Sequence, residues 1–306
     1  MKETLIQRYA KWEHNQETDG RLFLITDIHG QYKMFREVMK FLRFVNFPRP
    51  DQKPDFLINL GDMCDRGEGS FDVLSSFRDN PNFKTLDGNH EKLMFNGTRK
   101  LPYQSFVSTG SDARGERREH WMINGGDWMY NHDFNAVRAL ADWTETLPFA
   151  AELHIDGKVI GLSHASVAPN EIFDSAVETD WFEDRDVDWE NTKKAAMIAG
   201  DESQHFMYRE MMEYCLTFCR KVERQKIELN VKGVDAVLHG HCVQKHQPLI
   251  LGKTMYFDNG AFLHDPHEQK YYMNVLEYAP EDKDAIFGMF RLYQFYYDEH
   301  KMLCLK

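Results

Sequence analysis

The stretch DFLINLGDMCDRG, residues 55–67, places two carboxylates and a guanidinium directly after an apolar run. Residues 56–60 are almost wholly apolar, which is typical of a strand that is covered on both faces. Asp62, Asp65 and Arg66 follow within six residues of the end of that run. Charged groups so close to a buried segment cost free energy unless they have partners. We therefore expect this strand end to carry a functional site.

The same arrangement recurs on both sides of this stretch. Residues 21–26 (RLFLIT) predict a strand that ends at DIHG, and residues 83–86 (FKTL) predict a short strand that ends at DGNHE. Helices are predicted between these strands, over residues 31–45 and 71–78. A repeated order of strand, polar turn and helix predicts an α/β sheet. In such sheets the functional groups lie on loops at the carboxyl ends of the strands.

Four further segments complete the prediction. Residues 149–166 read as a hairpin that turns at Asp156-Gly157 and ends near His164. Residues 234–241 (VDAVLHGH) read as an apolar strand that ends at His241. The remaining predictions are a long helix over residues 207–227, a strand that ends at 258–260, and a terminal hairpin formed by residues 271–278 and 287–298.

Composition excludes several classes of protein. The net charge of −12, from 49 acidic and 37 basic residues, argues against sequence-independent binding of duplex nucleic acid. No apolar run approaches the roughly 20 residues of a membrane helix, and charges interrupt the first sixteen residues, unlike a signal peptide. The five scattered cysteines suit reduced thiols better than a disulfide framework. We therefore expect a cytoplasmic protein without a membrane segment.

The polar residues at the strand ends have the chemistry of metal ligands. They supply carboxylate oxygens, an amide oxygen and imidazoles, a mixture that suits Mn²⁺, Fe or Zn²⁺ better than Ca²⁺ or Mg²⁺. A carboxylate such as Asp62 can bridge two cations about 3.5–4 Å apart, which together clamp a phosphoryl oxygen and acidify a water. Phosphate also needs cationic donors, and the planar fork of Arg66 is suited to it. The candidates are Asp27, His29, Asp62, Asn89, His90, His164 and His241.

DIHG, GDMCDRG and GNHE, followed by a His after a strand and by a final Gly-His, resemble in order the motifs of calcineurin-like metallophosphoesterases. The final motif reads GHCV, with Val243 where nuclease and phosphodiesterase relatives carry another metal-binding His. This departure favours the phosphoprotein phosphatase branch. The resemblance covers roughly residues 20–265. It implies an α/β fold, a β-sandwich flanked by helices, with a binuclear metal site at the carboxyl edge of the strands.

The resemblance also implies a division of the chain. One metallophosphoesterase domain would span residues 1–306, with inserted loops at about 98–119 and 170–190 and a C-terminal β extension at about 268–306. It implies two divalent metal ions, Mn²⁺ first and Fe or Zn²⁺ as alternatives. The substrate would be a phosphorylated protein (on Ser, Thr or also Tyr) or a small phosphoester, in the cytoplasm of a bacterial or phage-infected cell. It leaves the oligomeric state open.

Roles for single residues follow from the resemblance by position. His90 would be the general acid, oriented by Asp65. Arg66 and Arg209, the latter from the segment MYRE, would bind the substrate phosphate. The first metal would be held by Asp27, His29 and the bridging Asp62, and the second by Asp62, Asn89, His164 and His241.

Other functions remain to be weighed. A hydrolase of symmetrical dinucleoside polyphosphates, or another nucleotide phosphatase, would share these motifs because they act on phosphate alone. Tyr208, Trp181 and Trp189 could line a base pocket, although packing or loop anchoring accounts for them better. A cysteine phosphatase is excluded, because no cysteine is followed six residues later by an arginine. A scaffold without catalytic function would have lost at least one of the site residues, and all are present.

The two inserted loops are read in two ways. Residues 170–190 carry nine acidic side chains, and residues 98–119 carry Arg114, Arg117 and Arg118. Each loop is either an ordinary solvated loop or a determinant of substrate choice at the edge of the sheet. An acidic loop near the site entrance would repel acidic substrates and would count against a polyphosphate site.

Overall fold

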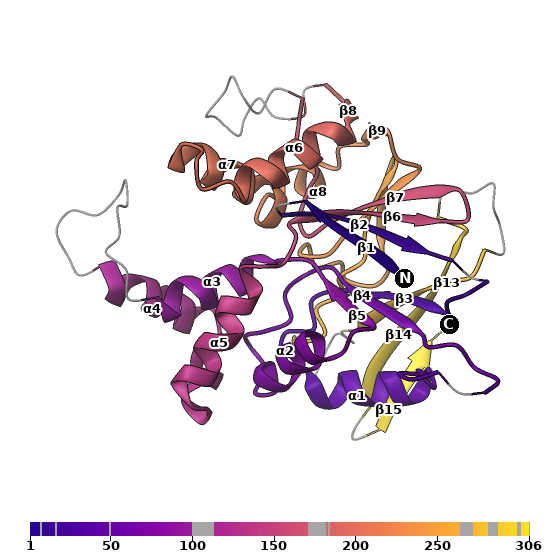
Figure 1. The fold of residues 1–306 in the computed structure, drawn as a ribbon, viewed down its shortest axis with the longest axis horizontal. Coiled ribbons are helices and arrows are strands. Elements are labelled where there is room, and N and C mark those ends of the chain that lie inside the picture. Colours follow the sequence, from indigo (N-terminus) through magenta and orange to yellow (C-terminus); the bar gives the residue numbers. More distant parts are fainter. Residues whose placement is uncertain are drawn as a thin grey trace.

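The computed structural model describes residues 1–6, 8–15, 17–48, 50–99, 113–170, 182, 184–263, 272–280, 287–298 and 301–305. Within these residues two large β-sheets pack face to face, and helices cover the outer face of each (Figure 1). The predicted α/β sandwich is confirmed. Among the described residues no helix is long and apolar enough to cross a membrane. The division into core, loops and extension stays a prediction.

The first sheet has seven strands in the order β1-β2-β6-β7-β10-β12-β11. Strands β7, β10 and β12 are parallel neighbours, so their carboxyl ends lie at one edge. The predicted hairpin of β6 and β7 is confirmed, and it turns at Asp156-Gly157. The bounds are β1 (Lys2–Ile6), β2 (Tyr9–His14), β6 (Ala150–Ile155), β7 (Lys158–Ser163), β10 (Ala236–His239), β11 (Leu249–Leu251) and β12 (Thr254–Tyr256).

The second sheet has six strands in the order β15-β14-β13-β3-β4-β5. Strands β3, β4 and β5 are parallel, whereas β13, β14 and β15 are antiparallel to their neighbours. The bounds are β3 (Leu22–Ile25), β4 (Phe56–Asn59), β5 (Phe83–Thr85), β13 (Met273–Tyr278), β14 (Phe290–Asp298) and β15 (Lys301–Leu305). A separate parallel pair is formed by β8 (Asp186–Asp188) and β9 (Asn230–Lys232).

Strand β3 shows why the central strands are apolar throughout. Leu22 and Leu24 point into the core between the sheets, whereas Phe23 and Ile25 pack into a second core under the helices. Alternate residues of a strand face opposite sides, so a strand buried on both faces needs apolar residues at every position. The same alternation holds in β4, which places the polar stretch after it at the edge of a rigid sandwich.

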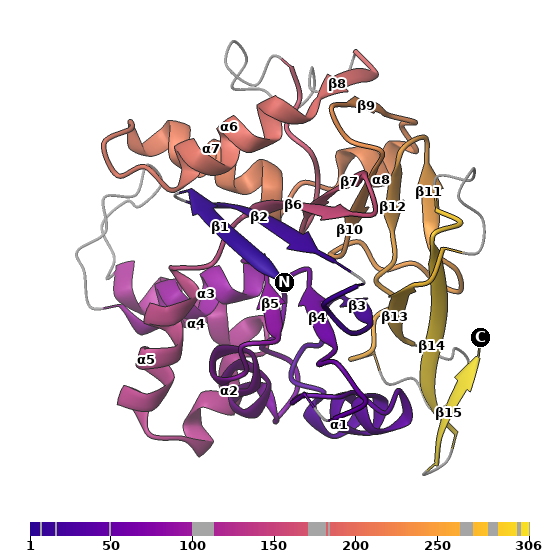
Figure 2. The ribbon, with the colours of Figure 1, turned by 45° about the vertical axis from the view of Figure 1, so that its right-hand side comes forward.

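The helices form the two outer layers. Helices α1, α2, α3 and α5 pack against the six-stranded sheet, and α6, α7 and α8 pack against the seven-stranded sheet (Figure 2). The bounds are α1 (Tyr32–Phe41), α2 (Ser70–Asp79), α3 (Asn89–Thr98), α4 (Ala113–Ile123), the short 3₁₀ helix η1 (Gly126–Asn131), α5 (Phe134–Thr144), α6 (Trp189–Ala199), α7 (Phe206–Thr217) and α8 (Lys221–Gln225).

Three elements differ from the sequence prediction. The single helix predicted over residues 207–227 is wrong, because α7 ends at Thr217 and α8 begins at Lys221. The carbonyl of Leu216 accepts a hydrogen bond from Ala165 N–H (2.8 Å), and the carbonyl of Phe218 faces His241 Nε2 (3.1 Å). These tertiary contacts take carbonyls that a continuous helix would use internally. The hairpin of β1 and β2 and the last strand, β15, were not predicted.

Candidate binuclear metal and phosphate site

The loops after four parallel strands of the two sheets meet at one edge of the sandwich. These are the loops after β3 and β4 in one sheet and after β7 and β10 in the other, and the N-terminus of α3 joins them. Such strand ends are where ligands bind in open α/β sheets. They bring together Asp27, His29, Asp62, Asp65, Arg66, Asn89, His90, His164 and His241, all but Arg66 buried.

Backbone strain is concentrated at this edge. Ten non-glycine residues of the described chain have positive φ, and six of them belong to the site. Left-handed backbone costs of the order of 1 kcal/mol or more for such residues and persists where surrounding contacts impose it. The loops are therefore held in one arrangement that serves the side chains. The six are Asp27, His29, Asp62, Asp65, Arg66 and His241.

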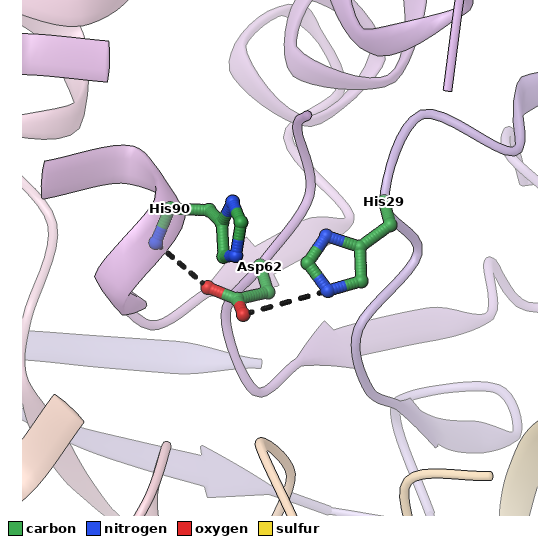
Figure 3. Close-up of side chains that lie close together, drawn as sticks. All are labelled: His29, Asp62 and His90. Atoms are coloured by element: carbon green, nitrogen blue, oxygen red, sulfur yellow. Dashed lines mark hydrogen bonds and ion pairs between the residues drawn. The ribbon is translucent and has the colours of Figure 1, made fainter. Parts of the chain in front are cut away.

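Asp62 lies at the centre of the site. Its Oδ2 atom is 3.6 Å from His29 Nε2 and 3.4 Å from His164 Nε2, so one oxygen faces imidazoles from both sheets. Its Oδ1 atom accepts a hydrogen bond from the backbone N–H of His90 (2.9 Å; Figure 3). Two groups of side chains have ligand atoms within 4.8 Å of one another, and both contain Asp62: it lies with His29 and His90 in one, and with His164 and His241 in the other.

The imidazoles are oriented from behind by backbone carbonyls. His29 Nδ1 donates to the carbonyl of Cys64 (2.9 Å) and His164 Nδ1 donates to that of Leu60 (2.7 Å). These bonds fix the orientation in which each ring turns its Nε2 toward Asp62. An outer nitrogen held by a carbonyl is the usual arrangement of a metal-binding histidine. The arrangement therefore fits a metal ion between Asp62 and these rings.

Asn89 and Asp27 extend the site on either side. One end of the Asn89 amide lies 2.9 Å from His241 Nδ1, 3.0 Å from His164 Nε2 and 3.3 Å from Asp62 Oδ2. Both oxygens of Asp27 instead accept the backbone N–H of His241 (3.1 and 2.9 Å). Asp27 lies outside both groups of close ligand atoms, so its role at the first metal rests on its position beside them.

The electrostatics of the site suit bound cations. Burial lowers the pKa of His29 and of His241, so both rings are neutral ligands. Burial alone would raise the pKa of Asp62, but His164 and His90 outweigh it and hold that pKa well below its usual range. Burial, with neighbouring Asp258, raises the pKa of Asp27. For His164, Asp62 outweighs the effect of burial and raises the pKa to about 10. The neutral rings of His29 and His241, with the ionised Asp62, supply donors that suit divalent metals of intermediate softness.

His90 and Asp65 form a second unit of the site. His90 Nδ1 donates to Asp65 Oδ2 (2.8 Å), which leaves Nε2 facing Arg66. The other oxygen, Oδ1, accepts the indole N–H of Trp121 (2.8 Å) and of Trp128 (2.9 Å). All of these side chains except Arg66 are at most 3% exposed. Asp65 thus receives three N–H donors, which satisfy both oxygens of the buried carboxylate and fix its orientation.

Arg66 presents its guanidinium to both units. Nη1 lies 2.9 Å from His29 Nε2 and Nη2 lies 3.0 Å from His90 Nε2. The guanidinium carbon stacks 3.9 Å from the centre of the Phe262 ring, whose edge also meets His29. A planar fork held in this way matches the geometry of a phosphate group.

A cavity of about 490 Å³ opens beside these groups. Its lining includes Arg220, whose Nε lies 3.0 Å from His241 Nε2. Arg209 is not among the described residues that line the cavity, and its Nε donates to the carbonyl of Ala199 (3.3 Å). Phosphate binding by Arg209 stays a prediction, and Arg220 is the guanidinium that sequence reasoning missed. The lining residues are Arg66, Asn89, His90, Leu93, His120, Asn124, Tyr214, Phe218, Arg220, Lys221, Arg224, Gln225 and His241.

Glu91 is a further residue that the sequence prediction left without a role. Its carboxylate accepts the backbone N–H groups of Asp62 (2.9 Å), Met63 (2.7 Å) and Gly88 (3.0 Å). A Cβ atom on Gly88 would lie 2.4 Å from Asp62 Oδ1, so only glycine allows this approach. Glu91 therefore fixes the backbone that carries Asp62.

Of the three aromatic residues considered for a base pocket, two lie away from the cavity and the third is outside the described residues. Trp189 is buried in the core under the seven-stranded sheet and donates to Tyr9 Oη (2.9 Å), and Tyr208 packs against the same core. Trp181 lies outside the described residues, as do residues 171–180 and 100–112 of the two loops. The described residues 182 and 184–190 do not line the cavity. The two readings of these loops stay predictions.

Comparison with known proteins places the fold in context. Residues 20–244 match the family model described as calcineurin-like phosphoesterase. The chain is 28% identical over 153 residues to serine/threonine-protein phosphatase 2 of Escherichia coli (49% of this chain, 60% of that protein). It is 30% identical over 119 residues to serine/threonine-protein phosphatase 1 of Salmonella typhimurium (39% and 41%). The matches thus span 60% or less of the length of these relatives.

A solved structure extends the likeness to almost the whole chain. The structure of a protein serine/threonine phosphatase from Saccharomyces cerevisiae superimposes with a TM-score of 0.53 at 15% identity, and covers 95% of this chain and 84% of that one. At this identity the likeness concerns the fold. The family model, in contrast, spans the motifs of all the predicted metal ligands from Asp27 to His241. The chain therefore belongs to the calcineurin-like phosphoesterase family.

Proposed function

We propose that this protein is a metal-dependent phosphatase that removes phosphate from phosphorylated serine and threonine side chains of proteins, and also from tyrosine. The observation that carries the proposal is the position of Asp62, whose Oδ2 faces imidazoles of both sheets while its loop also holds Asp65 and Arg66. One short segment thus joins a metal site, an acid and a phosphate ligand.

The proposed first metal would be held by His29 and Asp62 with Asp27 beside them, and the second by Asp62 with Asn89, His164 and His241. When bound, two divalent cations there would polarise the phosphoryl oxygens as Lewis acids and acidify a water. The mixture of nitrogen and oxygen donors favours Mn²⁺, with Fe and Zn²⁺ as alternatives.

The chain's own residues then bind the substrate and move a proton. Arg66 and Arg220 each lie within 3.0 Å of an imidazole at the site and hold the phosphate oxygens from two sides. His90 Nε2 faces the space beside Arg66, and a protonated His90 gives its proton to the leaving oxygen there. Asp65 stabilises the protonated ring through Nδ1, and Trp121 and Trp128 hold Asp65 in place.

The choice of phosphoproteins rests on two supports. The similar bacterial proteins are both serine/threonine-protein phosphatases, and Val243 stands where phosphodiesterase relatives carry another metal ligand. The second candidate is hydrolysis of dinucleoside polyphosphates. It is favoured by one observation, the presence of Arg66, Arg220, Lys221 and Arg224 around the cavity.

A metal-reconstituted assay separates these functions. The protein is stripped with a chelator, reloaded with Mn²⁺, Fe²⁺ or Zn²⁺, and given phosphoserine, phosphothreonine and phosphotyrosine peptides or diadenosine tetraphosphate. We expect turnover of the phosphopeptides only after reloading, and most with Mn²⁺. Turnover of diadenosine tetraphosphate that exceeds every phosphopeptide by orders of magnitude in kcat/KM would refute the proposal in favour of the second candidate.

A further inference from the structure

The charge of the cavity differs in sign from that of the protein. Of the described residues that line it, four are Arg or Lys and none is Asp or Glu, whereas the whole chain carries a net charge of −12. Only two of the four, Arg66 and Arg220, lie against the imidazoles of the proposed site. A hollow lined by one sign of charge concentrates ligands of the opposite sign. A substrate that carries a second anionic group would therefore match this lining better than a single phosphate group does.

Arg224 stands in the best position to use that charge. Its backbone N–H donates to the carbonyl of Arg220 (2.9 Å), so the two residues are one helical turn apart. Side chains with this spacing are neighbours whose Cβ atoms lie roughly 5–6 Å apart. Arg224 is also solvent-exposed, as a group that receives part of an incoming substrate must be.

The wall that carries Arg224 also carries two stacked aromatic rings. The cavity lies between α3 and α4 on one side and α7 and α8 on the other, and α7 lies above α3 and α4 in both views (Figures 1 and 2). Tyr214 and Phe218 stack along the second wall, with ring centroids 5.9 Å apart and planes 5° from parallel. His120 and Asn124 face them from the first wall. An apolar strip beside a basic group suits a peptide with alternating side chains.

We propose that Arg224 forms a specificity subsite for a second anionic group of the substrate, a carboxylate or a phosphate carried about two residues from the phosphate that is hydrolysed. An extended peptide advances roughly 3.3 Å per residue, so two residues match the separation of neighbouring positions on a helix. This inference rests on the proposed phosphoprotein phosphatase function and names its substrate class as acidic phosphopeptides.

The test compares four phosphoserine peptides that differ only in one residue. Glutamate lies two residues before the phosphoserine, two residues after it or about six residues away, and in the fourth peptide glutamine replaces it. The wild-type enzyme loaded with Mn²⁺ should show kcat/KM about threefold to tenfold higher for one of the two near-glutamate peptides than for the glutamine peptide. A peptide with phosphothreonine in place of that glutamate distinguishes a phosphate from a carboxylate as the preferred group.

Variants assign the preference to one side chain. Arg224→Gln should remove the preference, Arg224→Glu should reverse it, and Arg224→Lys should retain it. Lys226→Asn is the matched control, because Lys226 is an exposed cation two residues away that does not line the cavity. Asparagine tolerates the left-handed backbone of Lys226 (φ 53°). The control should keep the full preference, and thermal unfolding checks that every variant is folded.

The outcomes separate this inference from the function on which it rests. Equal kcat/KM for all four peptides, or a preference that survives in Arg224→Glu, would overturn the subsite and leave the phosphatase function standing. A protein that hydrolyses diadenosine tetraphosphate but no phosphopeptide would overturn both.

Discussion

The two aspartates of the stretch 55–67 should fail in different ways when each is changed to asparagine. Asp62 Oδ2 faces imidazoles on both sides, and it is the shared member of both groups of ligand atoms. Asp62→Asn halves the oxygen donors and removes the negative charge between the two proposed cations, so metal content and activity should fall together. In the described structure the side chain of Asp65 makes no hydrogen bond to a proposed metal ligand. Its carboxylate instead accepts hydrogen bonds from His90, Trp121 and Trp128.

The size of the Asp65→Asn effect follows from those three hydrogen bonds. Asparagine keeps one oxygen, so either the indole donors or the ring of His90 must face an amide N–H in a site that is fully buried. An unsatisfied buried donor costs about 1–3 kcal/mol of stability. The protonated form of His90 also loses the charge that stabilises it. We expect kcat to fall about 10²- to 10⁴-fold, the usual contribution of general acid catalysis.

The leaving group provides the decisive comparison. The leaving group of an aryl phosphate is a stabilised phenolate that needs little protonation, whereas the serine oxygen of phosphoserine must receive a proton as it leaves. Asp65→Asn should therefore reduce kcat on phosphoserine peptides far more than on 4-nitrophenyl phosphate, while metal analysis finds two ions per chain. The assay combines elemental analysis with kcat for both substrates, and Asp72→Asn, on an exposed part of α2, is the matched control. Equal metal loss in both site variants, or equal loss of kcat on both substrates in Asp65→Asn, would refute the assignment.

Three other predictions follow from the same contacts. Trp121→Phe and Trp128→Phe each remove one hydrogen bond to Asp65 and keep most of the packing. Each variant should lower kcat on phosphoserine peptides about threefold to thirtyfold while its metal content stays unchanged. Unchanged kcat in both variants would contradict a positioning role. Glu91→Gln leaves backbone N–H groups facing an amide, so it should lower the unfolding free energy by about 1–3 kcal/mol and weaken metal binding. Chemical denaturation and metal titration measure the two effects. Metal affinity equal to that of the wild type would contradict the role of Glu91 as the support of Asp62. Burial lowers the pKa of His239 to about 3, so the folded protein keeps this ring neutral. In the unfolded chain the ring has its ordinary pKa of about 6.5 and takes up a proton below that pH. The stability that rests on neutral His239 is thus fully present above about pH 6.5 and is lost as the pH falls toward 3. Between pH 7 and about pH 5, metal-free wild type should lose about 2 kcal/mol more unfolding free energy than His239→Gln, and parallel loss in the two proteins would show that His239 titrates normally.

Much of the fold could be predicted because the buried strands are short apolar runs with polar ends. Strands β3 and β4 face a core on each side, so all of their residues except Asn59 are apolar and the sequence predicts both strands clearly. The edge strands carry no such signal. Strand β1, in the segment KETLI, is mostly exposed and mixes charged with apolar residues, and it is held in the sheet by its pairing with β2. Strand β2 pairs in turn with β6, far along the chain, and composition does not reveal such a partner.

The residues of the site also fall into two groups, those that the sequence predicts and those that it does not. The residues that would touch metal or substrate lie in short motifs at strand ends, where an Asp or His stands out against an apolar run. The residues that hold them do not stand out. Trp121 and Trp128 read as ordinary core aromatics, and only their indole N–H groups, aimed at one oxygen of Asp65, give them a role. A bond that spans 56 or 63 residues of sequence leaves no local pattern.

Arg209 and Arg220 show how the end of a helix decides which side chain lies beside His241. The family resemblance assigns phosphate binding to Arg209 of the segment MYRE, within the single helix predicted over residues 207–227. In the structure the helix stops at Thr217, because its last carbonyls pair with the loop after β7 and with His241. The chain then turns at Phe218 and Cys219, and this turn brings Arg220 to within 3.0 Å of His241 Nε2. The carbonyl of Phe218 faces the same imidazole, so the break between α7 and α8 places both Phe218 and the Arg220 guanidinium beside His241.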